Sequence, residues 1–386
     1  MGAVDAWALS KYGTDRYGTF LPVHFTAWRY SQMSVLLAYC MVPFIKLFGF
    51  NTVTVRLPMV LISSGAVALV YLVGRKLFSD RIALVAMLLT AVNPWQFMQS
   101  RWSLDCNLFP HIFLLGFYLL LLGLEKRRYL YLSMVFFGLT FYCYGIAAYS
   151  VTAFLFVFFI WCLWKRQLKF REGLLCALIF TVVALPEVIV LGINAVHFGR
   201  TISTPLFTMP YFTDSVRSAD ILLLNFSFAQ LGKNAWALFS HVFLQLPDIF
   251  FNSIPAFGPL YHVSIPFVFV GIIVFTIQLF REKNIEKQTQ MLALWGFLVT
   301  GIWVGLITYE VNINRVNIIF YPIILLCAYG IGLTVRKWKK LWPVVAAAYG
   351  ISSILFFGTY FTTYAEESRQ YYNKDFMEAV AEADSL

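Results

Sequence analysis

Carboxylate and guanidinium side chains lie close together in four short motifs that separate long apolar stretches of this sequence. The motifs hold Asp15, Arg16 and His24 (YGTDRYG, then LPVH), Arg56 (VRLP), Arg101 and Asp105 (SRWSLDCN), and Arg315 (NINR). A carboxylate can take a proton from an acceptor hydroxyl. A guanidinium group can hold a phosphate and stabilise its charge as it departs. The motifs therefore favour a group transfer in which a phosphate is the leaving group.

The sequence contains no cradle for a soluble nucleotide, since neither a GxxxxGK[ST] loop nor a GxGxxG element occurs. We therefore expect the phosphate to belong to a lipid that is reached within the membrane. The candidate catalytic residues are Asp105 and Asp15. The candidate ligands of the donor phosphate are Arg56, Arg101, Arg315, Arg16 and His24.

Each motif also admits a purely structural role. Arginines at helix ends can extend toward lipid phosphates, and acidic residues can cap helices or pair with arginines. Glu187, which follows Pro186 in an apolar stretch, can be a satisfied interior acid, and His24 can be an interfacial polar group. We prefer the functional interpretation because three loops that carry Arg or Asp are expected on one face of an apolar bundle.

The composition is that of an integral membrane protein. Of 386 residues, 60% are hydrophobic and 12% are charged, whereas a soluble domain carries about 25% charged residues. The six cysteines are scattered singly, and the histidines show no HxxH or HExxH spacing. The sequence therefore indicates no metal site built from protein ligands alone. A divalent ion between Asp105 and a phosphate stays compatible with the sequence.

The apolar stretches predict an all-α, polytopic transmembrane bundle, because a crossing helix needs roughly 17–25 apolar residues. The ten expected crossings lie near residues 57–74, 82–98, 108–124, 129–146, 148–164, 173–193, 263–280, 290–308, 316–335 and 341–362.

Basic residues orient this bundle. Seventeen of the 29 Lys and Arg lie in five short loops, near residues 75–81, 125–128, 165–172, 281–287 and 336–340. With five acidic residues these loops carry a net charge of +12, and the rest of the chain carries −2. The positive-inside rule then predicts that the five loops are cytoplasmic. The basicity is thus an orientation signal, and no nucleic-acid partner is expected.

The orientation predicts three parts. Residues 1–56 form an outer N-terminal segment with a juxtamembrane helix, residues 57–362 form the bundle with a long outer loop at 194–262, and residues 363–386 form an outer tail. Segment 33–49 is apolar enough to be read as a crossing, but it is short and contains Pro43 and Lys46. We prefer an amphipathic helix in the outer interface for this segment.

The motifs, in their order and spacing, resemble the GT-C membrane glycosyltransferases. The similar stretches are DRYG…LPVHF, FGFNTVTVRLPMV, VYLVGRKLFSDRIALVAMLLTAVNPWQFMQSRWSLDCNLFP and NINRVNIIFYPIILL, within residues 1–335. The most similar branch contains the protein O-mannosyltransferases and the lipid A aminoarabinose transferase, which are family 39-like. The resemblance implies an outer active site, a polyprenyl-phosphate sugar as donor, an outer-loop carboxylate as general base, and inversion at the anomeric carbon.

The resemblance also implies roles for single residues. Asp105 matches the second outer-loop acid of the family, Arg56 the arginine of its RLP motif, and Arg315 a basic position near the phosphate. Asp15 and Arg16 match a turn of the first outer loop. Family members begin with a further transmembrane helix, followed by an outer Asp-Glu-Ala and, a few residues later, an Asp-Ala. Only the second half of this pattern, Asp5-Ala6, has a counterpart here. The principal base is therefore expected upstream of Met1, and the activity of this chain depends on that pair.

These observations predict a plasma-membrane, multi-pass enzyme that moves a mannose-like hexose from a polyprenyl-phosphate donor to an unknown acceptor outside the cytoplasm. Two alternatives remain open. The chain can be a transporter or lipid flippase, for which ten crossings are suitable, although such proteins usually have internal repeats and midplane charges. It can also be a catalytically impaired fragment that acts as a scaffold.

Overall fold

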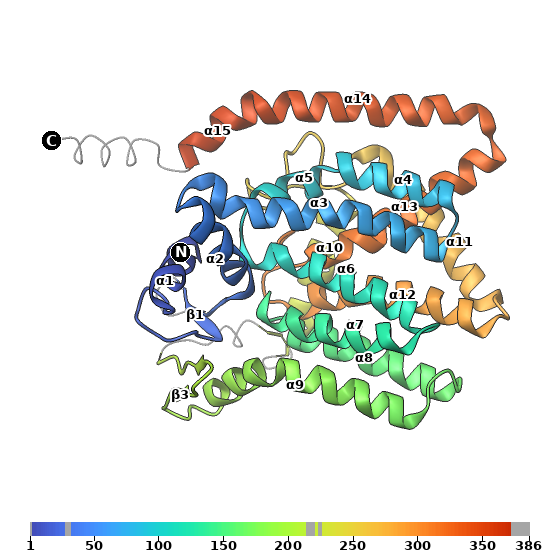
Figure 1. The fold of residues 1–386 in the computed structure, drawn as a ribbon. Coiled ribbons are helices and arrows are strands. Elements are labelled where there is room, and N and C mark those ends of the chain that lie inside the picture. The colour runs from blue at the N-terminus through green and yellow to red at the C-terminus, as the bar shows by residue number, and fades with distance from the viewer. Residues whose placement is uncertain (1, 28–31, 214–220, 223–225, 372–386) are drawn as a thin grey trace.

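The computed structural model describes residues 2–27, 32–213, 221–222 and 226–371, and these form a bundle of long helices (Figure 1). The helices before the long loop are α1 (Gly2–Tyr12), α2 (Leu36–Phe48), α3 (Thr52–Leu77), α4 (Asp80–Val92), α5 (Pro94–Arg101), α6 (Asp105–Gly123), α7 (Arg127–Leu139), α8 (Ala147–Trp164) and α9 (Phe170–Ala195). The later helices are α10 (Phe228–Val242), α11 (Ile265–Arg281), α12 (Ile285–Ile307), α13 (Phe320–Lys337), α14 (Trp342–Phe361) and α15 (Thr363–Tyr371).

Short elements join these helices. The 3-10 turns are η2 (Thr140–Tyr142), η4 (His262–Ser264), η5 (Asn317–Ile319) and η6 (Lys339–Leu341). Strands β1 (His24–Thr26) and β2 (Gln32–Ser34) pair antiparallel, with His24 opposite Ser34. Strands β3 (Ile202–Ser203) and β4 (Thr208–Met209) form a second antiparallel pair.

Eight helices among the described residues are long and apolar enough to cross a membrane, which confirms the predicted multi-pass bundle. They are α3, α6, α8, α9, α11 with η4, α12, α13 with η5, and α14 with η6. Each coincides with one of the ten expected crossings.

The expected crossing at 82–98 is not one straight helix. Helices α4 and α5 meet at an angle of 52°. Pro94 has no backbone N–H to continue the ladder, and the side chain of Asn93 accepts a hydrogen bond from the Gln96 N–H and so caps α5. The bend therefore follows from the Asn-Pro pair, and α4 with α5 makes a ninth span only if the bent pair crosses as a unit.

The expected crossing at 129–146 is also interrupted. Helix α7 ends at Leu139 and continues as the 3-10 turn η2, so the regular helix is shorter than an ordinary crossing. Figure 1 shows α7 running beside α6 and α8 between the same two ends of the bundle.

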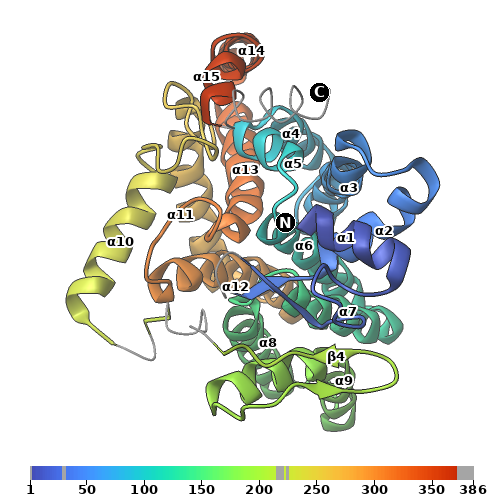
Figure 2. The same ribbon diagram turned by 90° about the vertical axis from the view of Figure 1, so that its left-hand side faces the viewer.

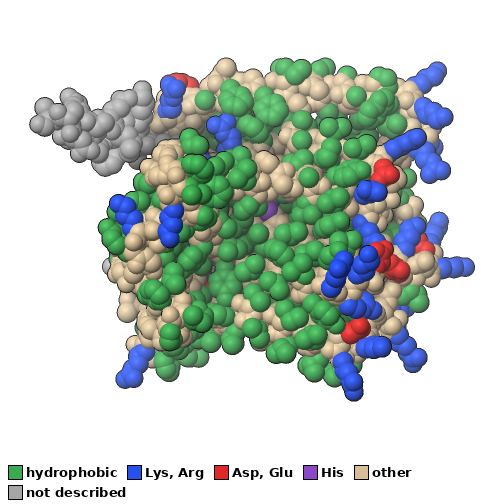
Figure 3. Space-filling model, in the orientation of Figure 1, with side chains coloured by type: hydrophobic (Ala, Val, Ile, Leu, Met, Phe, Trp, Pro, Cys, Tyr) green, Lys and Arg blue, Asp and Glu red, His purple; other side chains and the backbone are tan. Residues whose placement is uncertain are grey.

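The bundle has two chemically different ends. The loops at 75–81, 125–128, 165–172, 281–287 and 336–340 lie together at one end, which we call the basic end. Figure 3 shows most of the visible Lys and Arg side chains gathered there. Helices α1 and α2 and the β1–β2 hairpin lie at the opposite end, which we call the site end and which faces the viewer in Figure 2.

Helix α2 belongs to the site end and precedes the first long helix. It has 13 residues, fewer than the roughly 17 that a crossing requires, which agrees with an interfacial helix. The division into an outer segment 1–56, a bundle 57–362 and an outer tail 363–386 stays a prediction. Of that tail, residues 372–386 lie outside the described residues, as do residues 214–220 and 223–225 of the long loop.

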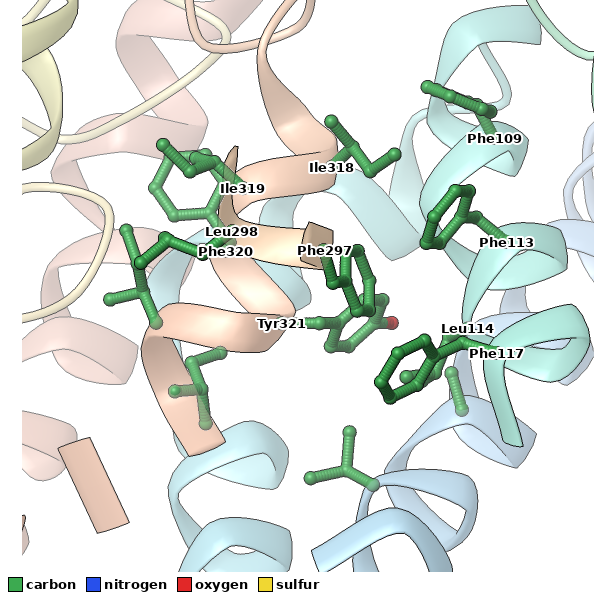
Figure 4. Close-up of a cluster of buried hydrophobic side chains, with 14 of the residues drawn as sticks. Phe109, Phe113, Leu114, Phe117, Phe297, Leu298, Ile318, Ile319, Phe320 and Tyr321 are labelled. Atoms are coloured by element: carbon green, nitrogen blue, oxygen red, sulfur yellow. The ribbon is translucent and has the colours of Figure 1, made fainter. Parts of the chain in front are cut away.

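Aromatic side chains fill the centre of the bundle. Phe113 and Phe117 of α6 pack against Phe297 of α12, with ring centroids 4.5 and 5.0 Å apart, and Figure 4 shows Tyr321 of α13 beside them. All four side chains are fully buried. This packed centre fixes the helix ends that carry the polar motifs.

Helices α11 and α13 touch backbone to backbone through two glycines. A Cβ atom on Gly330 would lie 2.0 Å from the carbonyl oxygen of Phe267, and one on Gly271 would lie 1.9 Å from that of Leu326. Small residues at such crossings let membrane helices approach closely. Any side chain at either position would force the two helices apart.

We therefore expect Gly330→Ala to lower the free energy of unfolding by about 3 kcal/mol, because the clashing atom belongs to the backbone and cannot rotate away. Thermal unfolding of the purified protein in detergent measures this effect. The control is Gly350→Ala on α14, where a Cβ would meet nothing within 4 Å, so stability should be unchanged or slightly higher. Equal melting of the two variants would contradict the close crossing.

Candidate functional site

Residues 102–104 connect α5 to α6 at the site end. This connection and the helix ends beside it bring three of the four motifs together. The Ser103 hydroxyl donates to the carbonyl of Val55, the residue before Arg56, at 3.4 Å. The Asn317 side-chain amide donates to the carbonyl of Cys106 at 2.9 Å. Because Arg315 lies two residues before Asn317, the segments carrying Arg56, Arg101, Asp105 and Arg315 are neighbours.

Arg56 and Arg101 line the same pocket at the site end. Its volume is about 280 Å³. It is bounded by Arg56, Met98, Arg101, Trp102, Ser103, Phe251, Tyr360, Phe361, Tyr364, Ala365 and Ser368. Guanidinium groups are the usual protein ligands of phosphate, and the phosphate-binding role of Arg56 and Arg101 stays a prediction.

Arg101 is held in place by aromatic faces. Its guanidinium carbon lies 5.1 Å from the ring centroid of Tyr360, 5.5 Å from that of Phe361 and 5.7 Å from that of Phe97. Such cation–π contacts orient the planar group without using up its N–H donors. Arg56, by contrast, is exposed. The pocket therefore combines one guanidinium group held against aromatic rings and one that is exposed to solvent.

Asp105 is the first residue of α6, where the helix dipole favours a negative charge. Its Oδ2 atom accepts a hydrogen bond from the Ser34 N–H at 3.0 Å. The β1–β2 hairpin thus fixes the orientation of the carboxylate. Asp105 follows Arg101 by four residues, so the acidic and basic groups of this motif lie on either side of the same short connection.

Arg315 has an acidic partner of its own. Its guanidinium donates to the Glu310 carbonyl at 3.1 Å and lies 3.9 Å from the Glu310 carboxylate, which is exposed. A single-atom ion pair that is open to solvent is weak. The structure therefore leaves Arg315 able to exchange Glu310 for another anion.

The hairpin makes a second contact with a carboxylate, on a different helix. The Nδ1 atom of His24 lies 2.9 and 3.0 Å from the two carboxylate oxygens of Glu187 on α9. Both side chains are buried, with 4% and 0% exposure. Glu187 is thus an interior acid that His24 holds through its Oε2 atom, while its Oε1 atom has no hydrogen-bond partner among the described residues. The pair attaches α9 to the N-terminal segment.

Asp15 and Arg16 make the contacts that the structure gives for them within residues 5–26. The Asp15 Oδ1 atom accepts hydrogen bonds from the Tyr17 and Thr19 N–H groups, both at 2.9 Å. Arg16 lies 3.6 Å from the Asp5 carboxylate and donates to the Thr26 carbonyl at 2.5 Å. Burial raises the pKa of Asp5, an effect that the Arg16 N–H and guanidinium partly offset. These contacts hold the N-terminal segment together, and the catalytic and phosphate-binding roles of both residues stay predictions.

The sequence did not predict two groups of residues that the structure brings together. Tyr360 and Tyr364 form a wall of the pocket, but their helices are distant in sequence and their motif signal is weak. A buried chain of hydrogen bonds also joins His111, Tyr321 and Gln96, at 2.5 and 3.0 Å. Isolated polar residues on apolar helices gave no indication of that contact.

No group of three or more His, Cys, Asp or Glu side chains that could hold a metal ion occurs among the described residues.

Comparison with known proteins identifies the fold. Residues 33–190 match the sequence profile of the dolichyl-phosphate-mannose-protein mannosyltransferase family. No curated protein matches the chain in sequence. The ArnT structure from Cupriavidus metallidurans bound to undecaprenyl phosphate is 13% identical, with a TM-score of 0.53 over 90% of this chain and 58% of ArnT. The apo structure of that ArnT gives the same score and coverage at 12% identity.

The oligosaccharyltransferase of Archaeoglobus fulgidus, solved with Zn and sulfate, is 14% identical, with a TM-score of 0.55 over 92% of this chain and 47% of that chain. The chain thus spans about half to three fifths of the length of these structures, and at such low identity the likeness concerns the fold alone. The resemblance noted in the sequence is confirmed. The chain has the fold of the GT-C membrane glycosyltransferases and, over residues 33–190, matches the dolichyl-phosphate-mannose-protein mannosyltransferase family.

Proposed function

We propose that this protein transfers a hexose from a polyprenyl-phosphate donor to an acceptor hydroxyl at the site end of the bundle. The observation that carries the proposal is the shared pocket of Arg56 and Arg101, which lies beside the connection to Asp105. The matched family is described by a dolichyl-phosphate-mannose donor, and the similar ArnT structure holds undecaprenyl phosphate. Both support a lipid-linked donor for this chain.

In the proposed reaction the two guanidinium groups hold the phosphate of the donor. The acceptor oxygen attacks the anomeric carbon from the opposite side, so a new C–O bond forms while the bond to the phosphate oxygen breaks. Asp105 takes the proton of the acceptor hydroxyl, and Arg56 and Arg101 stabilise the polyprenyl phosphate that departs. A single displacement of this kind inverts the anomeric centre.

The proposed active face is the non-cytoplasmic face of the plasma membrane. The basic end carries the Lys and Arg clusters, and the positive-inside rule places such clusters in the cytoplasm. The pocket is lined by residues from the start of α3, from α5 and the connection that follows it, and from the end of α14 and α15, and Figure 1 shows α15 and the start of α3 at the end opposite the basic loops. A membrane lipid could therefore reach the pocket from the outer leaflet.

The test uses the purified full-length protein with undecaprenyl-phosphate mannose, glucose and galactose, and measures released undecaprenyl phosphate. We expect Arg56→Ala with Arg101→Ala to reduce release at least about 100-fold, because loss of groups that bind transition-state charge acts on the rate. Arg200→Ala, an exposed arginine beyond the end of α9, is the matched control and should retain full turnover. Absence of release with every donor would contradict the transferase and favour the transport or scaffold interpretation.

A further inference from the structure

Helix α15 forms one side of the pocket at the site end. It follows α14 after a break at Thr362, and in Figure 1 it turns away from the axis of α14. The residues of α15 that line the pocket are Tyr364, Ala365 and Ser368. Their spacing of one and four residues places them on the same face of the helix. A single face of α15 therefore covers the pocket.

The two faces of α15 differ in charge. Tyr364 is buried, and Ala365 and Ser368 are half-buried. The exposed residues of the helix include Glu366, Glu367, Arg369 and Gln370, and the first of these pairs with Arg369 at 3.0 Å. None of the described residues that line the pocket is acidic. The helix thus turns its carboxylates away from the two guanidinium groups and leaves the pocket positively charged.

The inner face of α15 lies over open space. The pocket of about 280 Å³ separates this face from Arg56 and from the connection between α5 and α6. An amphipathic helix ordinarily buries its inner face against packed side chains. Here a positively charged cavity takes their place, so an anion can bind between α15 and the bundle.

Aromatic stacking attaches α15 to the loop after α10. The ring of Phe250 stacks on Tyr364 and on Tyr371, with centroids 4.9 and 4.2 Å apart. Tyr371 also lies 5.8 Å from the ring of Phe251, and its own side is 59% exposed. Each aromatic pair contributes modestly to stability. The helix can therefore leave the pocket without unfolding the bundle.

Ser368 offers the pocket a hydroxyl whose present partner is replaceable. It donates to the carbonyl of Ala365 in the same helix at 2.9 Å. A serine hydroxyl rotates, and it can exchange such a local bond for another acceptor. A hydrogen bond to an ionised phosphate is stronger than one to a neutral carbonyl. A phosphate in the pocket would therefore draw the hydroxyl toward itself.

We propose that α15 is a lid that closes over the donor phosphate. Arg56 and Arg101 hold the phosphate from the bundle side, the Ser368 hydroxyl binds it from the lid, and the stack of Tyr371 on Phe250 keeps the lid closed. This inference rests on the proposed function and assigns a further ligand and a closing element to the same site. Closure excludes water from the phosphate, which strengthens its attraction to the guanidinium groups.

The first experiment measures the affinity of the purified full-length protein for undecaprenyl phosphate and for inorganic phosphate. Ser368→Ala should weaken the binding of the lipid about tenfold, the effect of one hydrogen bond to a charged group. Ser352→Ala is the matched control, because Ser352 is a half-buried serine of α14 outside the pocket lining. It should bind as wild type does. Inorganic phosphate, which has no apolar chain, should bind far more weakly than the lipid.

The second experiment measures the rate at which undecaprenyl phosphate dissociates. Tyr371→Ala removes the stack on Phe250 and should raise this rate about fivefold. Tyr371→Phe keeps the ring and should retain the wild-type rate. The melting temperatures of both variants should stay close to that of wild type, because the side chain is 59% exposed. A change in dissociation rate without a change in melting distinguishes a lid from a structural helix.

Either an unchanged affinity in Ser368→Ala or an unchanged dissociation rate in Tyr371→Ala would overturn the lid. If Arg101→Ala still weakened the binding of the lipid, the phosphate site and the proposed function would stand without it. Equally fast dissociation in Tyr371→Phe would assign the effect to the lost hydroxyl and remove the stack as the closing contact. Inorganic phosphate that binds as tightly as the lipid would identify a site for free phosphate instead. Failure of the wild-type protein to bind the lipid would refute the proposed function as well.

Discussion

Asp105→Asn is expected to reduce the rate of hexose transfer by about 10²–10⁴-fold, the usual contribution of a positioned general base. An asparagine keeps an oxygen that can accept the Ser34 N–H, so the hairpin contact of 3.0 Å is retained. The amide cannot take a proton from the acceptor hydroxyl. The loss should therefore appear in kcat, with little change in KM for the donor.

Single-turnover transfer from undecaprenyl-phosphate hexose measures this effect, and a melting temperature close to that of wild type verifies the fold. Asp80→Asn is the control, because Asp80 starts α4 at the basic end and pairs with Arg75 on an exposed surface. Transfer within about twofold of wild type in Asp105→Asn would remove Asp105 from the catalytic step. An increase confined to KM would make it a binding residue.

Glu187→Ala is expected to lower the free energy of unfolding by about 1–3 kcal/mol, because it leaves the Nδ1 atom of His24 buried without its hydrogen-bond partner. His24 and Glu187 lie at 4% and 0% exposure, so solvent does not reach the contact. The pair is also the side-chain link between β1 and α9. Its loss should loosen the N-terminal segment before the rest of the bundle.

Thermal unfolding in detergent, with proteolysis of the N-terminal segment as a local readout, checks this expectation. The control is Arg75→Ala, which breaks an exposed ion pair with Asp80 and should cost less than about 1 kcal/mol. The double variant His24→Phe with Glu187→Leu should recover part of the stability, since apolar side chains can replace a buried ion pair. Melting of Glu187→Ala at the wild-type temperature would show that the pair contributes nothing.

The charged side chains of the site end differ in whether an oppositely charged side chain already pairs with them. His24 and Glu187 pair with each other inside the protein, and Arg16 is engaged by Asp5 and Thr26. Arg56 is exposed, and Arg101 rests against aromatic rings rather than a carboxylate. The groups best placed to bind an anion are therefore Arg56 and Arg101, which supports the assignment of the phosphate to the pocket they line.

The sequence by itself determined that this is a membrane protein, where its long apolar helices lie, and that its Lys and Arg clusters gather at one end of the bundle. A run such as Thr52–Leu77 can bury its backbone in lipid only as a helix, so composition and length are sufficient to predict it. The predicted orientation likewise required no tertiary information. The chain changes side of the membrane at each crossing, so basic loops that follow every second expected crossing all lie on the same side. Eight of the expected crossings appear as long helices for this reason.

Local chemistry limited that prediction at two places. Asn93 caps α5, and Pro94 prevents α4 from continuing as a straight helix. Hydropathy alone predicts one uninterrupted crossing at this place. The end of α7 at Leu139 is similar, because the apolar pattern continues into a 3-10 turn. Hydropathy measures transfer into lipid and carries no information about backbone angles.

Only the tertiary structure decided which polar residues share a site. His24 and Glu187 are 163 residues apart in the chain, and Asp248 meets Ile313 across 65 residues. Such contacts depend on how helices cross, which is set by close packing at places such as Gly330 and by the aromatic centre around Phe297. A sequence read one segment at a time fixes which end of a helix a residue occupies. The side of the helix that faces a neighbour, and hence the partner of each charge, follows from packing.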